Sequence, residues 1–128
     1  MTRALACRDM APYKRFVAWK ECHKLVLDVY QATQSFPKYE LYGLTSQARR
    51  AAFSAAANIV EGSSRKGRNE FRRFLDIALA SLSEVEYALE VASALGYLES
   101  ETSAALEVQQ RRARFLTWKL QMSLRAPE

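Results

Sequence analysis

The longest apolar pattern in the chain is the feature that most limits its fold. Apolar residues return every three or four positions for about seven helical turns, a spacing that places them on one face of an α-helix. Gly96 follows the last of them and is a natural helix terminator. The series is Phe71, Phe74, Leu75, Ala78, Leu82, Val85, Leu89, Ala92 and Leu95.

Three further segments show helical spacing, and short connections make successive helices antiparallel neighbours. Four Gly and three Pro among 128 residues leave little material for the turns of an all-β fold. The sequence therefore predicts an all-α fold, an up-down-up-down antiparallel four-helix bundle over residues 13–125 that follows a flexible N-terminal arm, residues 1–12. The helices are expected near residues 14–35, 45–62, 69–95 and 100–124.

Single residues predict where these helices begin and end. The first helix should stop before Phe36, because Pro37 pushes the preceding residue out of the α region. Thr45 and Ser100 are expected as N-caps, since a hydroxyl can accept a hydrogen bond from a first-turn N–H. Gly62 is expected just past the end of the second helix.

Charge and cysteine content restrict the setting and the partners. Nineteen Lys and Arg against 14 Asp and Glu give a net charge of +5, which is compatible with nucleic acid and also normal for a helical bundle. The chain has no apolar run of the roughly 18 to 20 residues that a membrane helix needs. Cys7 and Cys22 form no C-x-x-C pair. We expect a cytoplasmic protein without a membrane partner.

The residues that catalysis or metal binding would require are missing from the pattern. A di-iron bundle takes Glu-x-x-His from two helices, whereas this chain has only His23, with no carboxylate three residues before it. Adjacent Cys22 and His23 do not share a helix face, so we interpret them as packing residues. With His23 as the sole candidate base, no nucleophile triad can be argued, and no glycine-rich phosphate loop occurs. We expect no enzyme, metal or cofactor.

Polar residues follow one face of each of the two middle helices. If the hairpin between them turns near residue 67, antiparallel partners have numbers that sum to about 134. Arg50 then faces Glu84, and Glu61 faces Arg73. We interpret both as interhelical ion pairs that fix register, in preference to a polar core for a ligand or for catalysis.

The turn between these helices is rich in cations. A solvated turn would explain them, but a phosphate-binding patch also explains why they gather there. The turn itself has no aromatic residue for base stacking, so sequence-specific recognition of a single strand is not implied. With Arg73 assigned to an ion pair, the candidate nucleic-acid-binding residues are Arg65, Lys66, Arg68 and Arg72.

The last helix adds three cations, Arg111, Arg112 and Arg114. Phe115 and Leu116 are expected in the core. Trp118 fits either the core or an exposed anchor for a partner helix, and its pattern does not distinguish them.

Five strings taken in order match a known family. They are residues 16–20 FVAWK, 37–47 PKYELYGLTSQ, 49–51 RRA, 58–62 NIVEG and 70–78 EFRRFLDIA. Together they resemble the bacterial four-helix-bundle proteins whose genes were first noticed inside intervening sequences of large-subunit ribosomal RNA. That family in turn distantly resembles the accessory protein of diversity-generating retroelements.

The resemblance implies a ring-shaped homo-oligomer, with a pentamer as the expected form. The distant accessory protein binds nucleic acid and a reverse transcriptase, so these are implied partners. Most family members have no assigned activity. We therefore expect a non-enzymatic homo-oligomeric adaptor that binds RNA or DNA backbone through its basic patch. The alternative is a structural or protein-binding oligomer with no nucleic-acid role.

Overall fold

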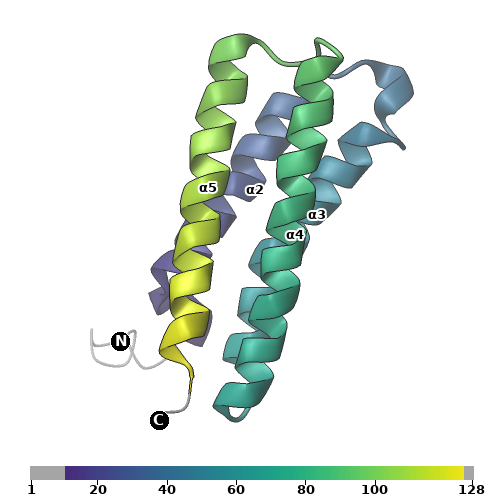
Figure 1. Ribbon diagram of the computed structural model, residues 1–128. Coiled ribbons are helices and arrows are strands. Elements are labelled where there is room, and N and C mark those ends of the chain that lie inside the picture. Colours follow the sequence, from purple (N-terminus) through teal and green to yellow (C-terminus); the bar gives the residue numbers. More distant parts are fainter. Residues whose placement is uncertain (1–10, 126–128) are drawn as a thin grey trace, which may run out of the picture.

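The computed structural model describes residues 11–125 as four α-helices with two short 3-10 helices (Figure 1). No strand occurs within these residues, so the predicted all-α class is confirmed. The arm predicted at residues 1–12 lies outside the described residues, except for Ala11 and Pro12. The elements are η1 (Pro12–Arg15), α2 (Val17–Thr33), η2 (Lys38–Glu40), α3 (Leu44–Ser63), α4 (Arg68–Ala94) and α5 (Ser100–Ser123).

The helices form the predicted up-down-up-down bundle. Each packs on two neighbours: α2 on α3 and α5, and α4 on α3 and α5. Consecutive helices run in opposite directions, so the start of α2, the α3–α4 turn and the end of α5 meet at one end (Figure 1). Two contacts show this meeting, a Phe16–Phe71 ring pair at 5.6 Å and a hydrogen bond from Gln121 Nε2 to the Arg72 carbonyl at 3.1 Å.

Small residues on α3 let it approach α4 closely. Five alanines of α3 are buried, and a short side chain at a helix contact allows the two backbones to come near each other. Gly62 continues this face at the end nearest the turn, where a Cβ would lie 2.8 Å from both Phe71 Cδ1 and Phe74 Cβ. The buried alanines are Ala48, Ala51, Ala52, Ala55 and Ala56.

The helix ends differ from the predicted ones for local reasons. α2 begins at Val17 instead of residue 14, because Phe16 is extended (φ −85°, ψ 125°) after the 3-10 turn. Thr45 is not an N-cap; it is buried inside α3, and Gly43 holds that position. Gly62 does not terminate α3, which continues to Ser63, and its role is the close approach to α4. Ser100 is the first residue of α5, after an N-cap at Glu99.

Gly96 ends α4 as predicted. Its φ of 78° lies in the left-handed region that glycine adopts without a steric penalty. Its N–H donates to the Ser93 carbonyl at 3.0 Å, and the Tyr97 N–H donates to the Ala92 carbonyl at 2.9 Å. These two bonds form the Schellman motif that closes a helix C-terminus.

The last helix buries a different face from the one expected. Its inward side carries Gln109, Gln110, Thr117 and Gln121 together with Leu106 and Ala113. The prediction that Phe115 is core is wrong, because 56% of this residue is exposed. Leu116 does pack, half-buried, against the core. Trp118 is 48% exposed, which resolves its position in favour of the surface.

The fold predicts that replacing Gly62 with Ala destabilises the protein, the opposite of the usual effect of this change within a helix. In an unhindered helix interior such a change stabilises by about 1 kcal/mol. Gly62→Ala should instead lower the free energy of unfolding by about 1 to 3 kcal/mol, because the methyl group overpacks the α3–α4 contact. Urea denaturation followed by circular dichroism measures it.

Gly67→Ala is the control for Gly62→Ala. No atom lies within 4 Å of the methyl it would add, so its cost of about 1 to 3 kcal/mol comes from the backbone alone, at φ 89° and ψ 153°, a region that essentially only glycine adopts. A Gly62→Ala protein more stable than the parent would contradict the close approach.

Candidate nucleic-acid interface

The α3–α4 turn presents the predicted cations at one end of the bundle. Arg65, Lys66 and Arg68 are exposed, whereas Arg72, in the second turn of α4, is half-buried. Gly67 precedes α4 with φ 89°, a conformation that lets the chain reverse sharply between the two helices. The structure therefore brings the four residues to the same end, although not in equivalent surroundings.

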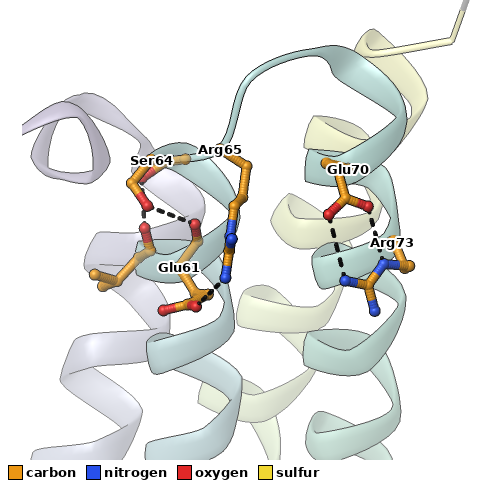
Figure 2. A network of polar contacts seen from close by, with 7 residues as sticks. Glu61, Ser64, Arg65, Glu70 and Arg73 are labelled. Atoms are coloured by element: carbon orange, nitrogen blue, oxygen red, sulfur yellow. Dashed lines mark hydrogen bonds and ion pairs between the residues drawn. The ribbon is translucent and has the colours of Figure 1, made fainter.

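The ion pairs at this turn are local ones (Figure 2). Glu61 accepts from Arg65 Nη2 at 2.6 Å, four residues along α3. Arg73 Nε donates to Glu70 Oε2 at 3.1 Å, three residues back along α4. The predicted Glu61–Arg73 pair is therefore wrong, because each partner has a nearer opposite charge on its own helix.

Arg65 and Arg73 are further held by one aromatic ring. Their guanidinium carbons lie 5.2 Å and 4.8 Å from the Phe74 ring centroid. The hydrogen bond between Arg73 and Glu70, and then the charge of the partner, lower the pKa of Glu70 and raise the pKa of Arg73. Both charges are thus compensated locally, which leaves other cations to interact with a ligand.

Among the four candidates, Lys66 and Arg68 are the ones that face solvent without a carboxylate partner in the described part of the chain. Neither takes part in an ion pair between residues 11 and 125. Arg72 differs again, since its Nε is buried and makes no hydrogen bond. Arg72 therefore supports the packing of α4 as well as adding charge.

The cations of α5 run from the middle of this helix to the same end, and the sequence prediction did not join them to the turn. Residues 111–125 contain five cations and no carboxylate: Arg111, Arg112, Arg114, Lys119 and Arg125. By contrast, residues 74–110 contain seven carboxylates and no Lys or Arg. Along α4 and α5 the bundle thus has a basic end, where α3 meets α4 and α5 finishes, and an acidic opposite half, to which η2 and the start of α3 add the cations Lys38, Arg49 and Arg50. The carboxylate-free stretch was the signal available in the sequence.

Two of the α5 cations serve the fold. Arg112 Nε donates to Glu21 Oε1 at 2.9 Å, and Gln109 Nε2 donates to Glu21 Oε2 at 2.8 Å. Hydrogen bonds from Gln109 and then Arg112 lower the pKa of Glu21, which keeps it ionised and joins α2 to α5. Arg111 pairs with Glu107.

The polar row between α3 and α4 confirms the predicted register but not its ion pair. Ser54 Oγ and Ser81 Oγ share a hydrogen bond of 2.8 Å, and their numbers sum close to the expected value. Arg50 and Glu84 line one hollow of about 290 Å³ with these serines. Arg50 and Glu84 form no ion pair within the described residues, because both side chains are exposed and gain little from pairing in water.

Cys22 and His23 are placed as packing residues. Cys22 is buried against Thr117, 3.6 Å from its hydroxyl, and burial raises the pKa of the thiol to about 11. The exposed His23 ring stacks on Trp19 at 4.9 Å. Among residues 11–125, no three His, Cys, Asp or Glu side chains come together as a metal site, and no helix is long and apolar enough to cross a membrane.

The fold and its charged end define a class, the small antiparallel four-helix bundles. Within that class, the family model described as 23S rRNA-intervening sequence protein matches residues 14–116. The chain belongs to this family. A comparison with curated proteins finds no significant match.

A crystal structure shares the fold. It is that of a protein with unknown function from the S23 ribosomal protein family of Bacteroides thetaiotaomicron VPI-5482. The TM-score is 0.73 and the identity 21%, over 81% of this chain and 97% of that chain. At that identity the likeness shows the fold alone.

The polar row predicts measurable coupling between the two helices. Ser54→Ala, Ser81→Ala and the double variant should give a coupling free energy of about 0.5 to 1.5 kcal/mol, because the hydroxyls bond each other. The matched cycle is Arg50→Ala with Glu84→Ala, which should couple by less than about 0.5 kcal/mol for an exposed, unbonded pair. A larger coupling for Arg50 and Glu84 than for the serines would contradict the arrangement.

Proposed function

We propose that the protein is a non-enzymatic homo-oligomeric adaptor that binds RNA or DNA backbone through its basic end. The observation that carries this proposal is the segregation of charge along the bundle. Phosphate contacts depend on clustered cations and require no particular base sequence. Lys66 and Arg68 supply exposed charge at the turn, and the acidic half orients the molecule by repelling the same backbone.

Assembly would multiply these contacts. In a closed ring each subunit presents one basic end, so a weak contact gains through avidity. The pentamer is proposed from the family resemblance. Its physical support is the exposed apolar surface, which includes Phe53, Ile77 and Tyr87 on α3 and α4.

The family name supports a connection with ribosomal RNA. It ties members to intervening sequences of 23S rRNA, which makes RNA the first ligand to test. A reverse transcriptase is a proposed partner only through the distant resemblance, and no residue of this chain is assigned to it.

A structural or protein-binding oligomer is the second candidate. A largely apolar hollow of about 450 Å³ favours it, lined by Leu44, Ala80, Tyr87, Ala88 and Val91 among others. Such a hollow can take a side chain of another protein. Absence of nucleic-acid binding at low salt would leave this candidate in place.

The salt dependence of binding tests the basic end. Lys66→Ala with Arg68→Ala should weaken binding to unrelated sequences about equally, and should reduce the slope of log affinity against log salt by about 1.4 to 1.8. Fluorescence anisotropy with labelled RNA and DNA across a salt series measures both. Adding Arg65→Ala and Arg72→Ala should weaken binding further, by less for Arg65 because Glu61 already holds it.

Lys38→Ala is the control for charge alone, because η2 lies at the opposite end of the bundle (Figure 1). It should leave the slope within error of the parent. If the four-residue variant folds and binds as the parent does, the basic end is not the interface.

Light scattering tests assembly. At micromolar concentration we expect a mass about five times the chain mass of 14.6 kDa, unchanged at high salt because apolar contacts are not screened. The ratio of absorbance at 260 and 280 nm shows whether bound nucleic acid adds to that mass. A mass of one chain would contradict the oligomer and the avidity argument together.

A further inference from the structure

The outward side of α5 is more aromatic than its inward side. Three amides and a threonine face the core together with Leu106 and Ala113, while Val108, Phe115 and Trp118 face solvent. A helix stabilised only by the bundle would place these residues the other way round. An exposed apolar face of this kind is typical of an interaction surface.

The two aromatic rings form a ready platform. Phe115 and Trp118 stack with centroids 6.2 Å apart and planes inclined by 28°. Both rings keep about half of their residue surface exposed, at 56% and 48%. Flat exposed rings of this kind accept a nucleobase, since every base has a π-face.

Cations flank the platform. Lys119 Nζ lies 5.8 Å from the Phe115 centroid. Arg114 Nη1 donates to Ser83 Oγ at 2.6 Å and to the Leu79 carbonyl. Both acceptors are neutral, so these bonds do not compensate the positive charge of Arg114. Neither cation belongs to an ion pair between described residues. Both can neutralise a phosphate beside a stacked base.

The C-terminal end of α5, beyond the platform, lies beside the start of α4 and its basic turn. Gln121, one helical turn after Trp118, donates to the Arg72 carbonyl and to Asp76 Oδ1 on α4. Arg72 is four residues beyond Arg68 of the turn. A strand that leaves the rings along α5 toward its C-terminal end thus reaches the cations of the turn.

We propose that the outward face of α5 binds single-stranded nucleic acid, with bases stacked on Phe115 and Trp118 and phosphates on Arg114 and Lys119. This inference rests on the proposed function and narrows its ligand class. A duplex keeps its bases stacked inside and would meet the cations alone.

The same face is a poor seam for a second copy. An isologous contact sets this face against a second copy of itself, so it would bring the unpaired Arg114 and Lys119 of both copies to one seam. Glu107, the nearest preceding carboxylate on α5, already pairs with Arg111, and residues 108–125 add no carboxylate to relieve that repulsion. Charge complementarity favours a polyanion.

The test compares strands with and without accessible bases. Phe115→Ala with Trp118→Ala should weaken binding of an unstructured single strand of about 16 nucleotides by at least tenfold, and of the same length of duplex by less than about twofold. Trp118→Phe keeps a ring and should stay within about threefold of the parent. Anisotropy gives the affinities, while circular dichroism and light scattering confirm fold and mass.

Tyr42→Ala is the matched control, an aromatic residue 93% exposed between η2 and α3, with Glu40 two residues before it. It should leave single-strand affinity unchanged. The inference is overturned if the double variant binds single strands as the parent does, if it loses single strand and duplex alike, or if it loses oligomer mass instead.

These outcomes separate this inference from the proposed function. If Lys66→Ala with Arg68→Ala weakens all binding but loss of the two rings does not, only the stacking platform fails. If the parent binds neither strand nor duplex, both proposals fail.

Discussion

The close approach of α3 and α4 is the contact on which the other features depend. Buried alanines and Gly62 bring the two backbones together, with the Phe71 and Phe74 side chains against the glycine. The tight turn that follows gathers Lys66 and Arg68 at one end. The same approach places Ser54 within hydrogen-bond distance of Ser81, which fixes the register of the hairpin. Packing of small residues therefore positions the charge on which the proposed function rests.

Negative and positive charges of α4 and α5 lie at different positions along the bundle. Carboxylates lie in the half formed by most of α4 and the start of α5, while cations collect where α5 ends beside the turn. Several cations are bound internally, Arg112 by Glu21 and Arg65 by Glu61. Lys119 lies beside the exposed aromatic pair, Phe115 and Trp118. This combination of charge and stacking surface is the one that single-strand binding uses.

Periodicity was enough to predict the four helices, their antiparallel order and the hairpin register. Periodicity gave wrong predictions where one sequence pattern is compatible with two structural roles. Gly62 has the same sequence context as a terminating glycine, and only the neighbouring phenyl rings show its packing role. The numbers of Glu61 and Arg73 have the sum expected for partners across the hairpin. Each residue pairs instead with an opposite charge three or four residues away on its own helix. On α5, the pattern predicted Phe115 in the core, whereas that side holds amides whose nitrogen donates to a backbone carbonyl, as Gln110 Nε2 does to Leu82.

Hydrogen–deuterium exchange with and without a single-stranded RNA tests the central claim, that nucleic acid binds the basic end, most directly. Backbone amides report where a ligand lies without altering any residue. The account predicts slower exchange in residues 63–73 and in the C-terminal half of α5, with no change across residues 84–107. Protection confined to residues 84–107, or no protection with RNA bound, would contradict it.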